Sequence, residues 1–380
     1  MSNADGYETN DSPHSLKTDM NYPVLTQRCF CHRSVVGSFV MSVLIGSMVT
    51  GCAASPSASE EILLRERATL CLNRALHYPE NPAVRAQAIE AAVEVLGTQG
   101  KMSVREKLED EHAGVRFAAC VALGQLQDRS AWAVIQKLTR DPDPSVRVAA
   151  YFAAEQMGES RYRRAWVELL RRHEDPVVRR NAVMLLGQLG EQRVIPLLQS
   201  AGFEDKDEGV QLQVVEALAL LGDADAVNRL MRDAYGGLGF RQPFALLAIG
   251  KVENNRVVSV LRSRLDSAPY PEARLAAARS LAMHGDPSGY DCAVRLLDWS
   301  DADEQLPDDL PANQIMRVQT MAAMALGDIG DRRALRWLRQ RMESSDDPRI
   351  QLAAARSILV ILNGTLVEDR IEETLPEPEP

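Results

Sequence analysis

The sequence predicts an all-α fold built from repeated helical hairpins, and three observations support this expectation. Of the 380 residues, 46% are hydrophobic but only 5% are aromatic, a balance that suits helices packed through small side chains better than a β-sandwich. One sequence pattern recurs along most of the chain, roughly from residue 80 to residue 363. Within each copy of this pattern, apolar residues return at the spacing of one helix face.

The repeat is anchored on an apolar position that follows Asp-Pro-x, as in Asp143-Pro144-Ser145-Val146. The equivalent positions are Val84, Val115, Val146, Val178, Val210, Arg241, Ala273, Val318 and Ile350. Successive positions are separated by 31, 31, 32, 32, 31, 32, 45 and 32 residues. A period this regular predicts a tandem array in which each copy packs against its neighbours.

The aligned columns predict two helices in every copy. Positions four and eight residues after the anchor are small or apolar throughout, as Ala150 and Ala154 are in the third copy. These offsets share one face of a helix with 3.6 residues per turn, so we expect that face to be buried. A second apolar column stands 20 residues after the anchor, where the third copy has Trp166. This column predicts the second helix of each hairpin.

The ends of the first helix carry their own signals. Asp-Pro before the anchor supplies an N-cap acceptor and a proline suited to the first helical turn. Glycines follow the anchor by nine or twelve residues, and we expect them to close the helix at its C-terminal cap. They are Gly124, Gly158, Gly187, Gly190, Gly222, Gly250, Gly285, Gly327 and Gly330.

The consensus D-P-x-V-R-x-x-A-x-x-A-L-G-x-L-G-D resembles the HEAT-repeat family, specifically the short HEAT-like repeats of the phycobilin-lyase type. This resemblance implies a right-handed α-solenoid of about nine HEAT-like helical hairpins over residues 60–363, in which residues 60–77 form a capping helix. With helices packed about 8–10 Å apart, such an array would extend over roughly 80 to 90 Å.

The N-terminal segment predicts an address outside the cytoplasm. Arg28 and Arg33 precede a charge-free stretch, residues 34–59, whose apolar part ends in Val-Thr-Gly-Cys52. A basic region, a short apolar region and small residues before a cut are typical of a secretory signal. The ending resembles the lipobox of bacterial lipoproteins, which implies a signal peptide over residues 1–51, lipidation of Cys52 and a tether over residues 52–59.

An uncleaved membrane anchor is the alternative, because the charge-free stretch is long enough to cross a bilayer. Both interpretations place the body of the protein outside the cytoplasm, since the positive flank stays inside. The lipoprotein interpretation locates the chain in the bacterial cell envelope, facing the periplasm. Met20 is a more natural start than Met1, because the first 19 residues carry four acidic side chains.

The one irregular spacing, 45 residues, marks an acidic insertion at residues 298–314. In repeat proteins such insertions often belong to the binding face. The candidate partner-binding residues are Trp299, Asp301, Asp303, Glu304, Asp308 and Asp309. The alternative is a solvated acidic loop in which Trp299 packs onto the adjacent helix. A calcium loop does not fit, because the segment lacks the turn glycine and the closing glutamate.

The position after each anchor is rich in arginine. It holds Arg85, Arg116, Arg147, Arg179 and Arg274, whereas four other copies have glutamine there. An arginine row could form a cationic stripe for an anionic partner. The family resemblance implies instead a structural ladder, in which this side chain bonds the Asp-side turn of an adjacent repeat.

No catalytic, metal or cofactor site is predicted. HEAT-like deoxyhypusine hydroxylases hold iron with paired His-Glu motifs inside their first helices, but the only such pair here, His173-Glu174, precedes Asp175-Pro176. Cys71, Cys120 and Cys292 are too widely separated to form a disulfide framework. A net charge of -10 without a basic run disfavours a nucleic-acid partner.

These features together predict a membrane-tethered scaffold that binds protein partners without catalysis. The alternative is an enzyme, or an enzyme subunit of the HEAT-like lyase type, that uses the solenoid groove as its pocket. After the array, residues 364–380 are acidic and rich in Pro and Glu, which predicts a disordered tail.

Overall fold

The computed structural model describes residues 58–237, 239–301 and 310–374. This part of the chain is α-helical with short 3-10 turns and contains no strand. The predicted signal segment and Cys52 lie outside it. None of its helices is both long enough and apolar enough to cross a membrane.

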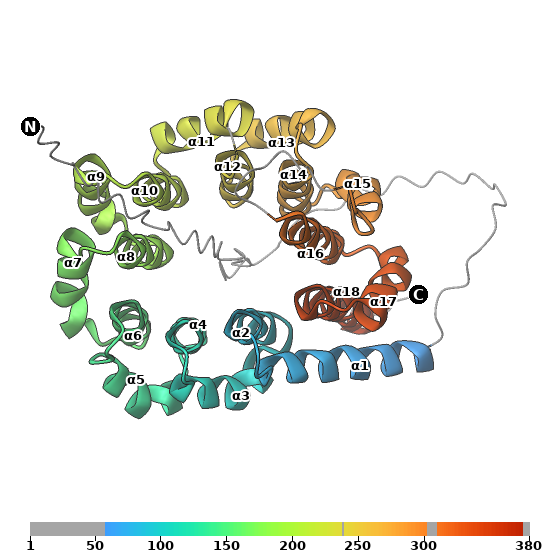
Figure 1. Ribbon diagram of the computed structural model, residues 1–380, viewed down its shortest axis with the longest axis horizontal. Helices are drawn as coiled ribbons and strands as arrows, with labels where there is room; N and C mark the ends of the chain where they lie inside the picture. Colours follow the sequence, from blue (N-terminus) through green and yellow to red (C-terminus); the bar gives the residue numbers. More distant parts are fainter. Residues whose placement is uncertain (1–57, 238, 302–309, 375–380) are drawn as a thin grey trace, which may run out of the picture.

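Two concentric layers of helices form the array (Figure 1). The inner layer consists of α2 (Pro82–Leu96), α4 (Ala113–Gln125), α6 (Pro144–Gln156), α8 (Pro176–Gln188), α10 (Glu208–Leu220), α12 (Arg241–Gly250), α14 (Pro271–Met283), α16 (Pro311–Ile329) and α18 (Pro348–Thr374). The outer layer consists of α1 (Ala58–Leu76), α3 (Lys101–Glu106), α5 (Trp132–Leu138), α7 (Arg163–Arg172), α9 (Ile195–Glu204), α11 (Ala224–Gly236), α13 (Asn255–Ser267), α15 (Tyr290–Leu296) and α17 (Leu335–Ser344).

The predicted register of the hairpins is confirmed. Every anchor falls in an inner helix, and Ala150 and Ala154, four and eight residues after the anchor in α6, have no exposed surface. Trp166 from α7 is also fully buried and donates a hydrogen bond from Nε1 to the carbonyl of Ala182 at 3.3 Å. Small inner side chains and larger outer ones therefore share one continuous core.

The two ends of the array differ from its middle. The last copy is a single long helix, because α18 continues to Thr374 and no second helix follows it among the described residues. The helix thus extends past residue 363 into the segment for which the sequence predicts a tail, and residues 375–380 lie outside the described part. At the other end, α1 begins at Ala58 and covers the first hairpin.

The array closes into a ring, as Figure 1 shows. Helix α18 packs against both α1 and α2, so the last repeat contacts the first. Arg65 on α1 donates hydrogen bonds to Asn363 Oδ1 at 2.5 Å and to the carbonyl of Leu362 at 2.9 Å. Asn363 donates in turn to the carbonyl of Val95 at 2.8 Å. The expected succession of helices packed about 8–10 Å apart therefore follows a closed circle. Inner helices with small side chains approach one another more closely than outer helices do. Each hairpin is therefore turned by a small angle relative to the one before it, and these angles add up to a closed circle.

A buried chain of four charges crosses the closure. Asp328 on α16 accepts from Arg279 Nε and from Arg356 Nη2, both at 2.8 Å, and Arg356 Nε donates to Glu94 on α2 at 2.8 Å. The side chains of Arg356 and Asp328 are only 3% and 1% exposed. Burial lowers the pKa of Arg356, but Asp328 and Glu94 together raise it above its ordinary value. The network is thus electrically balanced and joins the last repeats to the first.

The glycines fall into two classes rather than one. Those twelve residues after the anchor adopt positive φ, as Gly330 does at 77°, and end the inner helices as predicted. Those nine residues after it lie within the inner helices instead. A Cβ on Gly124 would lie 2.7 Å from the Cα of Ala153, and one on Gly187 would lie 2.7 Å from the Cβ of Ala217. The prediction of a capping role is wrong for this second class, whose function is to let neighbouring inner helices touch.

Candidate functional site

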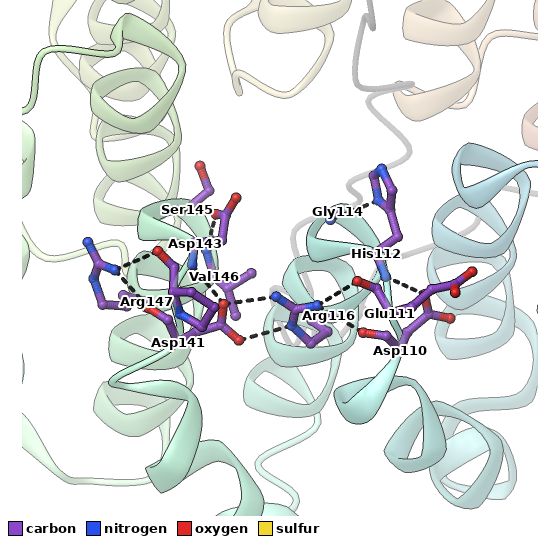
Figure 2. A network of polar contacts seen from close by, with 11 residues as sticks. Asp110, Glu111, His112, Gly114, Arg116, Asp141, Asp143, Ser145, Val146 and Arg147 are labelled. Carbon is purple, nitrogen blue, oxygen red and sulfur yellow. Dashed lines mark hydrogen bonds and ion pairs between the residues drawn. The ribbon is translucent and has the colours of Figure 1, made fainter.

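Arginines at the position after the anchor link consecutive turns along one edge of the ring. In three copies Nε and Nη2 of the arginine hold both carboxylate oxygens of an aspartate in the next turn, as Figure 2 shows for Arg116 and Asp141. The pairs are Arg85 with Asp110 at 2.9 and 2.9 Å, Arg116 with Asp141 at 2.9 and 2.9 Å, and Arg179 with Asp205 at 2.7 and 2.9 Å. Such bidentate contacts fix geometry as well as charge.

The same side chains also hold their own turns. Nη1 of Arg116 donates to the carbonyls of Asp110 and Glu111 at 2.9 and 3.0 Å, as Figure 2 shows. Where the repeat has glutamine, the amide makes only the carbonyl contact, as Gln211 does to Asp205 at 2.7 Å. Glutamine therefore replaces arginine in binding the turn but not in binding the carboxylate.

Two arginines of the row depart from this arrangement. Arg147 donates from Nη1 to the carbonyls of Asp141 and Pro142 at 2.7 and 3.1 Å, but contacts no carboxylate in the part of the chain that the structure describes. Arg274 donates from Nε to the carbonyl of Ala268 at 2.7 Å. The structure thus places the five arginines at equivalent positions, and brings only three of them onto aspartates.

Acid should weaken the three arginine–aspartate pairs, each of which forms a rung between consecutive turns, and Arg179→Gln tests this expectation. The hydrogen bond from Arg179 lowers the pKa of Asp205 although burial opposes it. Because the folded pKa is depressed, the stabilisation is present above the ordinary value of 3.8 and is lost as pH falls through the folded value. At neutral pH the substitution should lower the free energy of unfolding by about 2 kcal/mol.

Denaturant unfolding of both proteins at pH 7 and at successively lower pH measures this difference. We expect the gap between wild type and Arg179→Gln to shrink on acidification. Arg147→Gln, which removes no carboxylate partner, is the matched control and should leave the pH dependence unchanged. A gap that stays constant with pH would contradict an ionic rung.

The described ends of the predicted binding insertion are firmly held. Trp299 packs against the core, and its carbonyl accepts from Gln319 Nε2 at 2.9 Å. Asp298 forms an ion pair with Arg341 on α17. Asp301 is exposed, whereas Asp303, Glu304, Asp308 and Asp309 lie outside the described residues. The insertion is also shorter than predicted at its C-terminal end, because α16 begins at Pro311 and buries Gln314.

Burial makes the thiols of the described body poor nucleophiles. It raises the pKa of Cys71 to about 11, against a smaller opposing effect of Arg74. It also raises the pKa values of Cys120 and Cys292. A thiol rather than a thiolate is therefore the form present at neutral pH.

The histidines His112 and His173 have structural contacts in the turns. His112 caps α4, where its Nδ1 accepts from the amide of Gly114 at 3.1 Å. His173 Nδ1 accepts from the amide of Asp175 at 3.1 Å. Across the described ranges, no three His, Cys, Asp or Glu side chains gather in a way that could hold a metal ion.

A small cavity opens between α8, α10 and α12. The Lys251 ammonium lies 2.7 Å from Glu216, and Gln213 donates to the same carboxylate at 2.5 Å. The cavity, also lined by Met184 and Gln188, measures about 10 Å³, which is room for a single water molecule. This space is too small for an organic substrate.

The four charges at the ring closure are the main feature that the sequence interpretation missed. Glu94 and Asp328 stand ten residues after their anchors, and Arg279 and Arg356 stand six after theirs. These offsets lie on the inner face of the inner helices, where most copies have apolar or amide side chains. Acidic side chains at one of these offsets and arginines at the other were the sequence signal that could have revealed the network.

Comparison with known proteins identifies the repeats. The model for HEAT repeats matches residues 101–165 and 163–234, and the model for the PBS lyase HEAT-like repeat matches residues 318–344. No curated protein matches the sequence.

Solved structures with a similar arrangement include human deoxyhypusine hydroxylase in complex with glycerol. It is 14% identical, with 81% of this chain and 100% of that chain covered and a TM-score of 0.35. The complex of CpcE and CpcF of phycocyanin lyase from a Nostoc species is 19% identical, with 72% and 98% covered and a TM-score of 0.39. The family matches, together with the repeated hairpins, show that the chain contains HEAT repeats over residues 101–234 and a HEAT-like repeat over residues 318–344.

Proposed function

We propose that this protein is a lipid-anchored scaffold of the bacterial cell envelope that faces the periplasm and binds a protein partner without catalysis. HEAT arrays present extended surfaces on which partners dock. The acidic insertion carries the proposal, because it interrupts an otherwise regular ring. Its described ends are fixed by Trp299 and α16, while Leu310 beside it is 68% exposed.

The membrane tether rests on the sequence before the ring. Cys52 follows a basic and then an apolar segment, and α1 begins six residues later at Ala58. Six residues span at most about 20 Å, so a lipid on Cys52 would hold the first helix close to the bilayer surface. An uncleaved anchor would position the ring similarly.

A non-catalytic role is supported by the chemistry of the described side chains. Their thiols are held protonated by burial, and the cavity beside Lys251 admits only water. The enzymatic alternative is that the solenoid groove serves as a pocket. Its test is activity of the purified chain, whereas the scaffold proposal is tested by partner capture.

Site-specific photocrosslinking in native membranes tests both parts of the proposal. A photoreactive amino acid replaces Leu310 in the full chain, and the matched control places it at Arg295, which is exposed on α15. We expect one discrete protein adduct from position 310 and none from position 295. Cys52→Ala should move the protein from the membrane fraction to the soluble fraction.

Two outcomes would contradict the proposal. Equal labelling from both positions would mean that the insertion is not the binding surface. If Cys52→Ala stays in the membrane fraction without being processed, the chain is held by an uncleaved anchor and not by a lipid on Cys52.

A further inference from the structure

One rung of the arginine ladder is open. Arg147 contacts the turn before it through Nη1, at 2.7 and 3.1 Å, just as Arg116 and Arg179 contact theirs. In those two arginines the remaining edge, Nε and Nη2, holds an aspartate. In Arg147 this edge has no acceptor among the described residues.

The residue responsible is His173, which stands where three other turns have aspartate. Asp141 and Asp205 each accept the amide two residues later, both at 2.9 Å, and His173 Nδ1 accepts the amide of Asp175 at 3.1 Å. The histidine thus keeps the hydrogen bond within its own turn but offers no carboxylate to Arg147. Because Nδ1 accepts, the ring proton is on Nε2, so the imidazole presents a donor and cannot pair with a guanidinium.

Two nearby carboxylates are committed elsewhere, and a third, the exposed Glu174, forms no ion pair with Arg147. Asp143 caps α6 by accepting from the amides of Ser145 and Val146 at 2.8 and 3.1 Å. Asp175 caps α8 by accepting from the amide of Val177 at 2.8 Å. Arg274 does not offer an equivalent site, because it uses Nε for its own turn and so lacks the free Nε and Nη2 edge.

We propose that Arg147 binds a carboxylate supplied from outside the chain, an Asp or Glu side chain of the partner, which completes the rung. This assignment rests on the scaffold function proposed above and gives its partner an acidic contact. The two N–H groups of the guanidinium edge match the two oxygens of a carboxylate. The turn holds the guanidinium in the pose that binds aspartate at Asp110, Asp141 and Asp205.

Side-chain NMR of the full chain labelled with ¹⁵N-arginine tests the site without the partner. Sodium acetate is the first probe, sodium chloride at equal ionic strength is the control, and a capped, Glu-containing peptide is the second probe. We expect acetate and peptide to shift the Nε–H signal of Arg147 in a saturable way and to leave those of Arg85, Arg116 and Arg179 in place. A stronger response to the peptide per carboxylate supports a protein source, and an equal or weaker one assigns the site to small carboxylates and overturns the partner assignment.

Two variants make the result decisive. Arg147→Gln identifies the signal and keeps the turn contact, as glutamine does in four copies. His173→Asp supplies the missing carboxylate from within, so the Arg147 signal should move to the position of the paired arginines and lose its acetate response. An Arg147 signal that ignores both probes, or that already matches the paired arginines in wild type, overturns the proposal.

The partner contact is tested by a photoreactive amino acid at Glu174, which is exposed beside the open rung. Its adduct in native membranes should be lost in Arg147→Gln and in His173→Asp, and kept in Arg85→Gln. An adduct at position 310 but none at 174 leaves the scaffold function standing and overturns this assignment. Absence of adducts at both positions overturns the scaffold function, while the acetate response alone still decides whether Arg147 binds carboxylates.

Discussion

Replacing Arg356 by Met should lower the free energy of unfolding by about 3 to 5 kcal/mol. The side chain is 3% exposed and neutralises both Asp328 and Glu94 across the ring closure. Methionine has a similar volume but no charge, so the substitution leaves Glu94 without its cation in a largely buried place. Uncompensated buried charge costs far more than an exposed ion pair contributes. Denaturant unfolding followed by circular dichroism measures the loss.

The matched control for Arg356 is Arg262→Met. Arg262 also pairs with an aspartate, Asp286, at 2.7 Å, but its side chain is 64% exposed on the outer helix α13. We expect this variant to lose less than about 1 kcal/mol. Similar losses in the two variants would show that the closure network does not hold the ring.

Gly124→Val should cost about 3 kcal/mol by forcing α4 away from α6. A Cβ at this position would lie 2.7 Å from the Cα and 3.0 Å from the Cβ of Ala153. The nearest atom belongs to the backbone, so no side-chain rotation can relieve the contact. Helix propensity would favour valine over glycine here, and the expected loss therefore reports packing alone.

Gly236→Ala is the control for the packing prediction. Gly236 is the last residue of α11, and a Cβ there would meet no atom within 4 Å. Thermal unfolding should show an unchanged or slightly raised midpoint for this variant and a clear decrease for Gly124→Val. A stabilised Gly124→Val would mean that the inner helices are not in close contact.

Local features of the fold could be predicted because each rests on neighbours in sequence. The 3.6-residue periodicity places Ala150 and Ala154 on the buried face, and the Asp-Pro pair at Asp143 places the start of α6. The glycine classes could not be separated in this way. Gly124 and Gly158 stand nine and twelve residues after their anchors, but the offset alone does not reveal that the first meets a helix from the next repeat and the second ends its own helix with φ of 91°.

Closure of the ring could not be predicted because it depends on a small angle repeated many times. Each hairpin adds one increment of curvature, and no single repeat reveals whether the sum completes a circle. The contact between Arg65 and Asn363 joins residues 298 positions apart. The candidate site shows the same limit: the arginine row was visible in sequence, but the open edge of Arg147 depends on which residue faces it from the next turn.

The distance between α1 and α17 tests the closed ring most directly. Arg67 Nη1 lies 2.9 Å from Glu343 Oε1 in an exposed pair, so labels there should disturb little. Spin labels carried by unnatural amino acids at these two positions leave the native cysteines untouched. Pulsed electron paramagnetic resonance should give a single short distance in the full chain. A broad distribution, or a separation approaching the roughly 80 Å expected for an open array of about nine hairpins, would contradict closure.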